Sequence, residues 1–328
     1  MLALYLAAAS ASEPAPLRTF TDWAVGCDNR RSCQAVGLIP ENEAAGMTMV
    51  IARAPETDAV PEIRINIREA AATSLAVDGN ALPVRVKVID GVLRIDTRDT
   101  LSTIRAIRNG SRLSVLDHNK HTIGSVSLRG LTAALINMDD RQKRVGLLSA
   151  IGRPGKIPDS DVEPPPQLPN IVLPPRSALA PRRLSRSEVA KRYRALECDV
   201  PEPLSAESDT LRLDARTTLV IFTCQRYAYN NASFALLVDE SGAIRDAEFD
   251  TSPGIGEGNG NRVVNPSWDR ATRRFSVFDK ERGLGDCGVE QSYVWDGKRF
   301  RLVYEAIMNE CRGSTDFIPT WRATVSER

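Results

Sequence analysis

A proline-rich stretch near the middle of the chain constrains its fold more than any other feature of the sequence. Nine prolines lie between Gly152 and Arg183. Proline has no backbone N–H and a fixed φ, so it is excluded from helix interiors and from central strands of a sheet. Such a stretch favours an extended, exposed, polyproline-like conformation. Because long irregular segments are uncommon inside one compact domain, we expect residues 152–183 to form a linker between two domains.

The length of the chain agrees with this division. It has 328 residues, about twice the size of a common single domain. We expect a signal peptide at residues 1–11, an N-terminal domain at 17–151, the proline-rich linker at 152–183 and a C-terminal domain at 184–328. Hydrophobic residues make up 42% of the sequence, which is enough for each domain to bury a core.

Short alternating segments separated by turns predict strands in the N-terminal domain. In residues 62–69, isoleucines alternate with polar and charged side chains, as in a strand with one buried face. Residues 82–97 alternate on both sides of Asp90-Gly91, a pair suited to a type I′ turn, and therefore predict a β-hairpin. Antiparallel sheet should dominate this domain.

Two segments of the same domain have helical spacing. Apolar residues recur every three positions in residues 100–110, which end in Asn-Gly, a common helix stop. Residues 132–150 predict a closing helix, with Leu135, Met138 and Val145 as candidate apolar contacts.

The C-terminal domain begins with a helix signal and continues with strands. Ser185 and Glu188 form a capping box before a helical segment. The segments that follow predict an antiparallel meander: residues 217–226, 233–240, 243–249, 274–279, 292–297, 299–308 and 320–325. The predicted fold class is therefore α+β, mainly antiparallel β. It comprises two β-rich domains, each with one or two packed helices, joined by a proline-rich linker.

The first residues resemble an export signal. An apolar run from Leu2 to Ala9 is too short to span a bilayer, and Ala9-Ser10-Ala11 fits a small-residue cleavage site. The run lacks the usual basic residue in front of it. No later segment reaches 18 apolar residues, so we expect a soluble protein, without a transmembrane segment, in the periplasm or secreted.

Six cysteines in an exported chain predict a disulfide framework. Six cysteines allow 15 connectivities. Proximity along the sequence and the domain boundaries favour one of these connectivities, which consists of Cys27–Cys33, Cys198–Cys224 and Cys287–Cys311. A zinc site is the competing interpretation. The chain has no C-x-x-C pair, and its two histidines are far from every cysteine in the sequence.

Charge gives little indication of a partner. The chain has 43 basic and 42 acidic residues, and this balance gives no overall case for binding nucleic acid. Locally, residues 176–194 contain seven basic residues and one acidic residue, whereas residues 197–261 contain twelve acidic and four basic residues. Arg182, Arg183 and Arg186 in the basic stretch are candidate contacts for anionic lipid or another envelope polyanion. The alternative is that the two stretches screen each other.

Known catalytic patterns are absent from the sequence. It contains no G-x-S-x-G, H-E-x-x-H, P-loop or dinucleotide-binding motif, so we expect no cofactor, no metal and no enzymatic activity. His118 and His121 have a spacing that can hold a metal on a helix, but they lie in a polar turn. The glycines of residues 254–261 resemble a phosphate loop without the helix that such a loop requires. Carboxylates are numerous, so an envelope hydrolase with a carboxylate pair is one alternative.

Four segments resemble a known family of exported bacterial proteins. They are residues 20–38 (FTDWAVGCDNRRSCQAVGL), 127–146 (SLRGLTAALINMDDRQKRVG), 282–302 (RGLGDCGVEQSYVWDGKRFRL) and the pair Cys311-Arg312. The family is domain of unknown function 1176, and the resemblance spans most of the chain. The N-terminal half also resembles, more weakly, the invasion-associated locus B proteins. The family resemblance implies residence in the periplasm or outer envelope and no established activity.

Asp286 is the polar residue of the third segment whose role the sequence leaves open. An Asx-type bond to the nearby backbone is one role. A carboxylate that faces a ligand is the other, so Asp286 joins the candidate binding residues. We expect a non-catalytic envelope protein that binds another envelope protein or a cell-wall or lipid component. A structural or stress-resistance protein without a specific ligand is the second alternative.

The cysteine pattern leads to a direct test. Replacing Cys287 or Cys311 by serine should lower the free energy of unfolding of the C-terminal domain by roughly 2–5 kcal/mol, the usual loss for a native bridge. Thermal melts of the two variants measure this change. Melts that match the wild type in both cases would exclude a structural Cys287–Cys311 bond.

Overall fold

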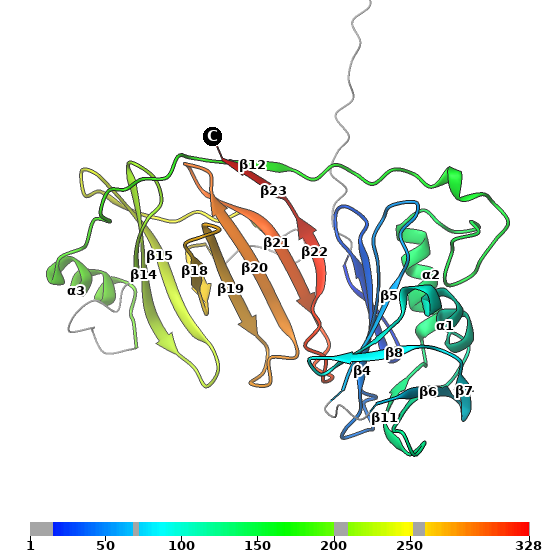
Figure 1. The fold of residues 1–328 in the computed structure, drawn as a ribbon. Coiled ribbons are helices and arrows are strands. Elements are labelled where there is room, and N and C mark those ends of the chain that lie inside the picture. The colour runs from blue at the N-terminus through cyan, green and yellow to red at the C-terminus, as the bar shows by residue number, and fades with distance from the viewer. Residues whose placement is uncertain (1–15, 68–71, 200–208, 252–259, 328) are drawn as a thin grey trace, which may run out of the picture. The chain divides into compact units, whose positions relative to one another are not determined.

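A computed structural model describes residues 16–67, 72–199, 209–251 and 260–327 (Figure 1). The expected signal peptide at residues 1–11 lies outside these ranges. So does most of the glycine-rich segment 254–261.

The chain divides into two compact units, which differ from the expected domains. The first unit comprises Met1–Leu168 and Ile307–Thr320, and the second comprises Pro169–Ala306 and Trp321–Arg328. The segment Ile307–Thr320 therefore belongs with the N-terminal part of the chain, although it was expected in the domain 184–328. The expected linker is itself divided between the units at Leu168.

The first unit contains two antiparallel sheets. The larger has seven strands in the order β1 (Arg18–Phe20), β2 (Trp23–Cys27), β3 (Cys33–Gly37), β4 (Thr48–Arg53), β5 (Glu62–Asn66), β9 (Val92–Ile95) and β8 (Val86–Ile89). The smaller has four strands in the order β11 (Thr122–Ser127), β10 (Arg112–Leu116), β6 (Ser74–Val77) and β7 (Asn80–Leu82).

The predicted hairpin is confirmed by β8 and β9. Asp90 and Gly91 both have positive φ, at 50° and 75°, as a type I′ turn requires. The alternating strand β5 also forms, and Ile63 and Ile65 are 2% and 0% exposed. Period-two alternation thus identified the buried face correctly.

Both sheets share one core with two helices, α1 (Thr100–Ile107) and α2 (Leu131–Arg141). A short 3-10 helix, η1 (Thr97–Asp99), precedes α1, and another, η2 (Asp159–Asp161), lies further along this unit. The helix α2 packs on β1, β2 and β3 (Figure 1). It begins after Gly130, whose φ is 96° and where a Cβ atom would lie 1.8 Å from the carbonyl oxygen of Phe20. Only glycine allows this approach.

The closing helix is shorter than predicted. It ends at Arg141, and Leu135 and Met138 are fully buried as expected. The predicted contact at Val145 is wrong, since this side chain is 60% exposed. Lys143 has a positive φ of 57°, so the chain has already left the helix before it reaches Val145.

A buried ion pair holds the end of α2 against the large sheet. Arg53 Nη2 donates to Asp139 Oδ1 and Arg53 Nε donates to Gln142 Oε1, both at 2.6 Å. The other bonds to Asp139 come from the backbone N–H groups of Ile151 and Gly152. A buried ion pair needs such additional bonds to offset the cost of desolvation.

A second buried carboxylate, Asp22, lies after β1 and is 2% exposed. It accepts hydrogen bonds from Ser127 Oγ (2.6 Å), Arg129 Nε (3.1 Å) and Arg312 Nη2. Burial by itself raises the pKa of Asp22, but the bonds from Ser127, Arg312 and Arg129 outweigh it and lower the pKa below 3.8.

Arg312 explains why Ile307–Thr320 belongs to the first unit. Besides Asp22, its guanidinium donates to the carbonyl oxygens of Thr21 (2.8 Å) and Ile39 (2.9 Å). The backbone N–H of Ile39 in turn donates to the Arg312 carbonyl at 3.0 Å. These bonds join residues that lie more than 270 positions apart in the sequence.

The second unit contains two five-stranded sheets. One has the order β13 (Asp209–Arg212), β14 (Thr217–Arg226), β15 (Asn231–Asp239) and β16 (Ile244–Asp246), with β17 (Arg262–Val264) paired to β15. The other has the order β18 (Ser267–Asp269), β19 (Arg274–Lys280), β20 (Gly288–Trp295), β21 (Phe300–Met308) and β22 (Ile318–Arg322). The last two residues of β21 and the first three of β22 fall in the segment Ile307–Thr320. Side chains of both sheets form one core, so this unit is a sandwich.

The predicted capping box is confirmed at the start of α3 (Arg186–Ala195). Ser185 caps the helix, and the Glu188 side chain accepts from the Ser185 backbone N–H. Tyr193 packs edge-on against Phe222 of β14, with ring centroids 5.7 Å apart. The helix thus covers the face of this sheet that lies opposite the sandwich core.

The sequence predicted that the whole proline-rich stretch is exposed. The structure shows that part of it is buried. It contains β12 (Asn170–Leu173), which pairs in parallel with β23 (Thr324–Glu327). Ile171 and Leu173 are 5% and 2% exposed and pack against Val294 and Val303. A strand therefore forms here although prolines flank it, because proline is tolerated next to the ends of a short strand.

All six cysteines are disulfide-bonded. Cys27 bonds to Cys33 and Cys198 bonds to Cys224, as expected. Cys287 and Cys311 are the remaining disulfide-bonded residues. Among the helices of the described residues, none combines the length and the apolar character needed to cross a membrane.

The bonds of Asp22 lead to a prediction about stability. Arg312→Ala should lower the free energy of unfolding by roughly 3–5 kcal/mol, because it removes one partner of a buried ion pair. Arg98→Ala should melt like the wild type, since Arg98 pairs with Asp96 at the surface. Chemical denaturation measures the free energy of unfolding of both variants. An equal decrease in the two variants would contradict the assigned role of Arg312.

The same carboxylate predicts a pH dependence. A lowered folded-state pKa contributes stability above the unfolded pKa of about 3.9, and this contribution is lost as the pH falls through the folded value. The stability difference between wild type and Asp22→Asn should therefore be largest near neutral pH and should narrow below about pH 4. Denaturation series over this range measure it, and a difference independent of pH would contradict the prediction.

Candidate functional site

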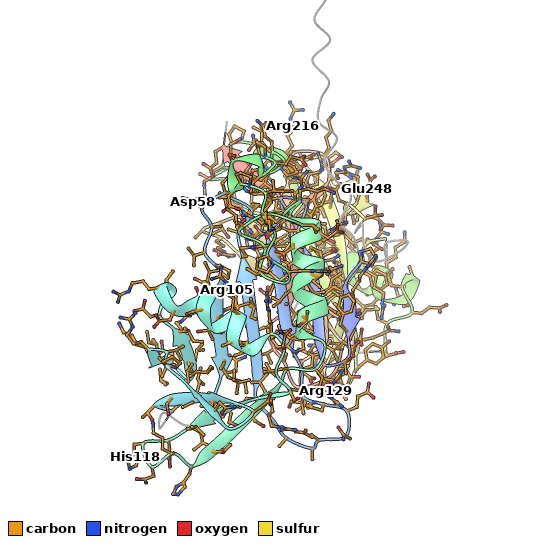
Figure 2. All side chains as sticks on the ribbon, turned by 90° about the vertical axis from the view of Figure 1, so that its right-hand side faces the viewer. Asp58, Arg105, His118, Arg129, Arg216 and Glu248 are labelled. Carbon is orange, nitrogen blue, oxygen red and sulfur yellow. A yellow bond between two sulfur atoms is a disulfide. The ribbon has the colours of Figure 1, made fainter. Side chains whose placement is uncertain are left out.

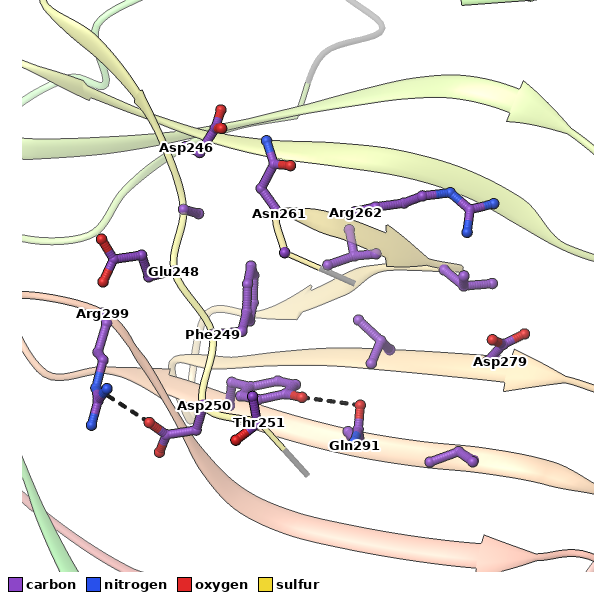
Figure 3. Close-up of a pocket in the computed structure, with 17 residues that line it drawn as sticks. Asp246, Glu248, Phe249, Asp250, Thr251, Asn261, Arg262, Asp279, Gln291 and Arg299 are labelled. Carbon is purple, nitrogen blue, oxygen red and sulfur yellow. Dashed lines mark hydrogen bonds and ion pairs between the residues drawn. The ribbon is translucent and has the colours of Figure 1, made fainter. Parts of the chain in front are cut away.

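The second unit contains a cavity of about 490 Å³ (Figure 3). It lies between the two sheets of the sandwich. Its lining comes from the segment after β16, from β17, β19 and β20, and from the turn between β20 and β21. Small-molecule sites commonly have this size and occur in concave, mainly apolar surroundings.

One wall of the cavity is built from facing residues of β19 and β20. The antiparallel register pairs Val277 with Gln291 and Asp279 with Val289. Tyr293 occupies the next position on the same face of β20. Side chains two residues apart share one face of a strand, so this wall has a polar amide between apolar neighbours.

An aromatic cluster fixes the opposite segment of the lining. Phe249 stacks on Phe300 with ring centroids 4.8 Å apart, and it meets Tyr293 edge-on at 5.1 Å. Phe249 also forms a β-bridge with Phe300. These contacts hold residues 246–251 in place beside the cavity.

Asp250 is bound by two arginines. Its Oδ1 lies 3.2 Å from Arg299 Nε, and its Oδ2 accepts from Arg301 Nε at 2.9 Å and from the backbone N–H of Leu302 at 3.1 Å. Figure 3 shows the bond between Asp250 and Arg299 at the edge of the cavity. Asp250 therefore anchors the turn between β20 and β21.

A chain of hydrogen bonds runs from the cavity into the interior. Tyr293 Oη donates to Gln291 Oε1 at 3.0 Å, and Gln291 Nε2 donates to Glu305 Oε2 at 2.8 Å. Glu305 is fully buried. Burial, reinforced by the negative charges of Glu305 and Asp250, raises the pKa of Tyr293, so its hydroxyl stays protonated.

Asp279 and Arg262 are two of the charged residues that line the cavity (Figure 3). Asn230 Nδ2 donates to Asp279 Oδ1 at 3.2 Å. The Asp279 side chain keeps contact with solvent, but the surrounding atoms displace part of its water. This desolvation raises the pKa of Asp279, and the positive charge of Arg262 opposes the shift.

Asp286, predicted from the sequence as a candidate ligand contact, is 2% exposed. Its carboxylate accepts from Arg282 Nε at 2.7 Å and from Arg282 Nη2, in a bidentate pair. Asp286 does not line the cavity. Its described geometry is that of a residue that fixes the turn before β20.

The three candidate arginines lie at the surface before and at the start of α3. Arg182, Arg183 and Arg186 are all exposed. Arg182 Nη1 donates to the carbonyl oxygen of Glu240 at 3.3 Å, whereas Arg183 and Arg186 form no ion pair with any residue that the structure describes. None of the three lines the cavity.

The histidines lie in the first unit, at the outer tip of the turn between β10 and β11, where Figure 2 labels His118. His121 lies 3.6 Å from Asp117, and both histidine side chains are exposed. Within the described ranges, neither histidine takes part in a group of three potential metal ligands. The surface-turn interpretation agrees with this placement.

Comparison with known proteins identifies the family. A family model described as "Protein of unknown function (DUF1176)" matches residues 17–326. The chain belongs to this family. The resemblance found in the sequence motifs is thus confirmed over nearly the whole chain.

One curated relative is the uncharacterised protein YpfG of Escherichia coli strain K12. It is 28% identical over 314 residues, which cover 90% of this chain and 88% of YpfG. A solved structure, the invasion-associated protein B of Bartonella henselae, aligns with 39% of this chain and 99% of its own at 16% identity and a TM-score of 0.29.

Sequence patterns did not single out the cavity. Two local signals could have pointed to it. The motif 282–302 contains four of the lining residues, and within this motif Gln291 is a polar residue between Val289 and Tyr293 on one face of a strand. Phe249 and Arg262 come from separate segments, and only the packing of the two sheets brings them to the same cavity.

The hydrogen-bond chain leads to a prediction. Gln291→Leu should lower the free energy of unfolding by about 1–3 kcal/mol, because Glu305 loses a donor while it stays buried. Chemical denaturation measures this loss, with the exposed Lys298→Ala as a control that should match the wild type. A Gln291→Leu variant as stable as the control would show that the amide contributes little.

Proposed function

We propose that this chain is a non-catalytic binding protein of the bacterial envelope, whose sandwich cavity receives a cell-wall or lipid component. The supporting observation is the cavity itself, which combines an apolar wall of Val277, Val289 and Phe249 with polar and charged groups around it. Such a combination holds an apolar body and orients it through a small number of polar contacts.

The cysteines support the envelope as the location. All six are disulfide-bonded, and disulfides persist in oxidising compartments such as the bacterial periplasm. The short apolar run and the small-residue site at the start of the sequence agree with export to this compartment.

The bonds of Asp250 favour binding over hydrolysis. A hydrolase with paired carboxylates needs one acid that donates a proton and a second that acts as base or nucleophile. Asp250 already accepts bonds from Arg301 and Leu302 and pairs with Arg299. These partners occupy both of its carboxylate oxygens, so Asp250 is poorly suited to either role.

A cavity-filling variant tests the proposal. Val277→Trp should reduce the cavity, whereas Val172→Trp places the same side chain at an exposed position of β12 in the same unit. We expect native mass spectrometry of protein purified from an intact periplasm to find a bound species on the wild type and on Val172→Trp. This species should leave on denaturation and should be strongly reduced on Val277→Trp.

Two results would contradict the proposal. One is a bound species present in equal amounts on both variants, which would place the ligand elsewhere. The other is a wild-type protein that carries no bound species after gentle purification. That result would favour a structural role without a specific ligand.

A further inference from the structure

The cavity is lined by more acidic than basic side chains. The acidic residues are Asp246, Glu248, Asp250 and Asp279, and the basic residues are Arg262 and Arg299. Arg299 pairs with Asp250, and Asp246 faces Leu236 on the side of its sheet that α3 covers. Glu248, Asp279 and Arg262 remain, so carboxylates still outnumber guanidinium groups. Clefts with low-dielectric walls focus the field of such charges, so the rim should attract cations.

The Tyr293 hydroxyl on the inner wall can only accept a hydrogen bond from a ligand. Gln291 donates its amide to Glu305, so its carbonyl oxygen faces Tyr293 and accepts the phenolic proton. The hydroxyl hydrogen of Tyr293 is therefore already used, and only the lone pairs of its oxygen are left for a ligand. A ligand group that binds here has to donate.

The remaining wall is apolar. Val277 and Val289 are only partly buried, although they belong to the face of the sheet that points into the sandwich. Covering these side chains and Phe249 would remove apolar surface from water, which is favourable. An anion is the less suitable partner, because Arg262 is the only lining arginine without a carboxylate partner within 4 Å among the described residues.

We propose that this cavity selects ligands in which an apolar body ends in a primary ammonium group. This inference rests on the proposed binding function and specifies its ligand class. The ammonium group donates to Tyr293 Oη and lies in the field of the rim carboxylates, and the apolar body covers the valines. A primary ammonium offers three donors and one positive charge, and it needs no donor from the protein.

A series of eight-carbon probes with different head groups tests this inference on the full-length protein. The probes are n-octylamine, n-octanol and octanoate, with ethanolamine as an ammonium without an apolar body, and calorimetry measures their affinities. We expect n-octylamine to bind about 5-fold or more tightly than n-octanol, the gain from one partly exposed charge pair, and octanoate to bind weakest. Added salt should weaken n-octylamine binding and leave n-octanol binding unchanged.

A matched pair of variants locates the effect. Asp279→Asn should weaken n-octylamine binding by about 2–5-fold without changing n-octanol binding. Glu197→Gln removes an exposed carboxylate of the same unit outside the cavity. This variant should change neither the affinity for n-octylamine nor the affinity for n-octanol. Equal weakening by both variants would mean that general surface charge is responsible, and this would overturn the inference.

The outcomes separate the two proposals. Equal binding of the three octyl probes, preference for octanoate, or ethanolamine binding as tightly as n-octylamine would overturn the ammonium inference while the binding function stands. Failure of all the octyl probes to bind would contradict the proposed function of the cavity itself, and the ammonium inference with it.

Discussion

The first unit depends on one buried carboxylate. Asp22 is removed from water and surrounded by donors, and the donor from Arg312 comes from the other end of the chain. Removing a charge from water costs several kcal/mol, so the site is stable only when these donors are in place. The carboxylate thereby specifies that the segment Ile307–Thr320 completes the N-terminal sheet and its helices.

Local features of the fold could be predicted from the sequence. The hairpin at Asp90-Gly91 and the helix capped by Ser185 follow from turn and capping chemistry, which involves only neighbouring residues. The division into units could not be predicted, because it depends on Arg312 and its distant partners. The strand Asn170–Leu173 was missed because proline content outweighed a four-residue alternation.

The candidate site also depends on contacts between distant segments, which local sequence patterns do not predict. Its wall consists of facing positions on two adjacent strands, which a correct register prediction could have paired. Its other side comes from the segment 246–251 and from β17, and only the closing of the sandwich brings these segments to the wall. Asp286, which belongs to a family-typical motif, is instead paired with Arg282. Other residues of the same motif, Val289, Gln291, Tyr293 and Arg299, do line the cavity, so the motif and the cavity overlap although Asp286 itself lies outside the lining.

The pairing of Asp22 with Arg312 sets an order of events during synthesis. Asp22 leaves the ribosome early and Arg312 very late, because 290 positions separate them. Most of the first unit is made before its last segment exists. Ser127 and Arg129 are then already available to Asp22, whereas the donor from Arg312 is still missing. Contacts of such long sequence separation form slowly. The first unit can therefore complete the bonds of Asp22 only once the C-terminal end of the chain is present, so a chain that ends before Arg312 leaves this buried carboxylate without one of its donors.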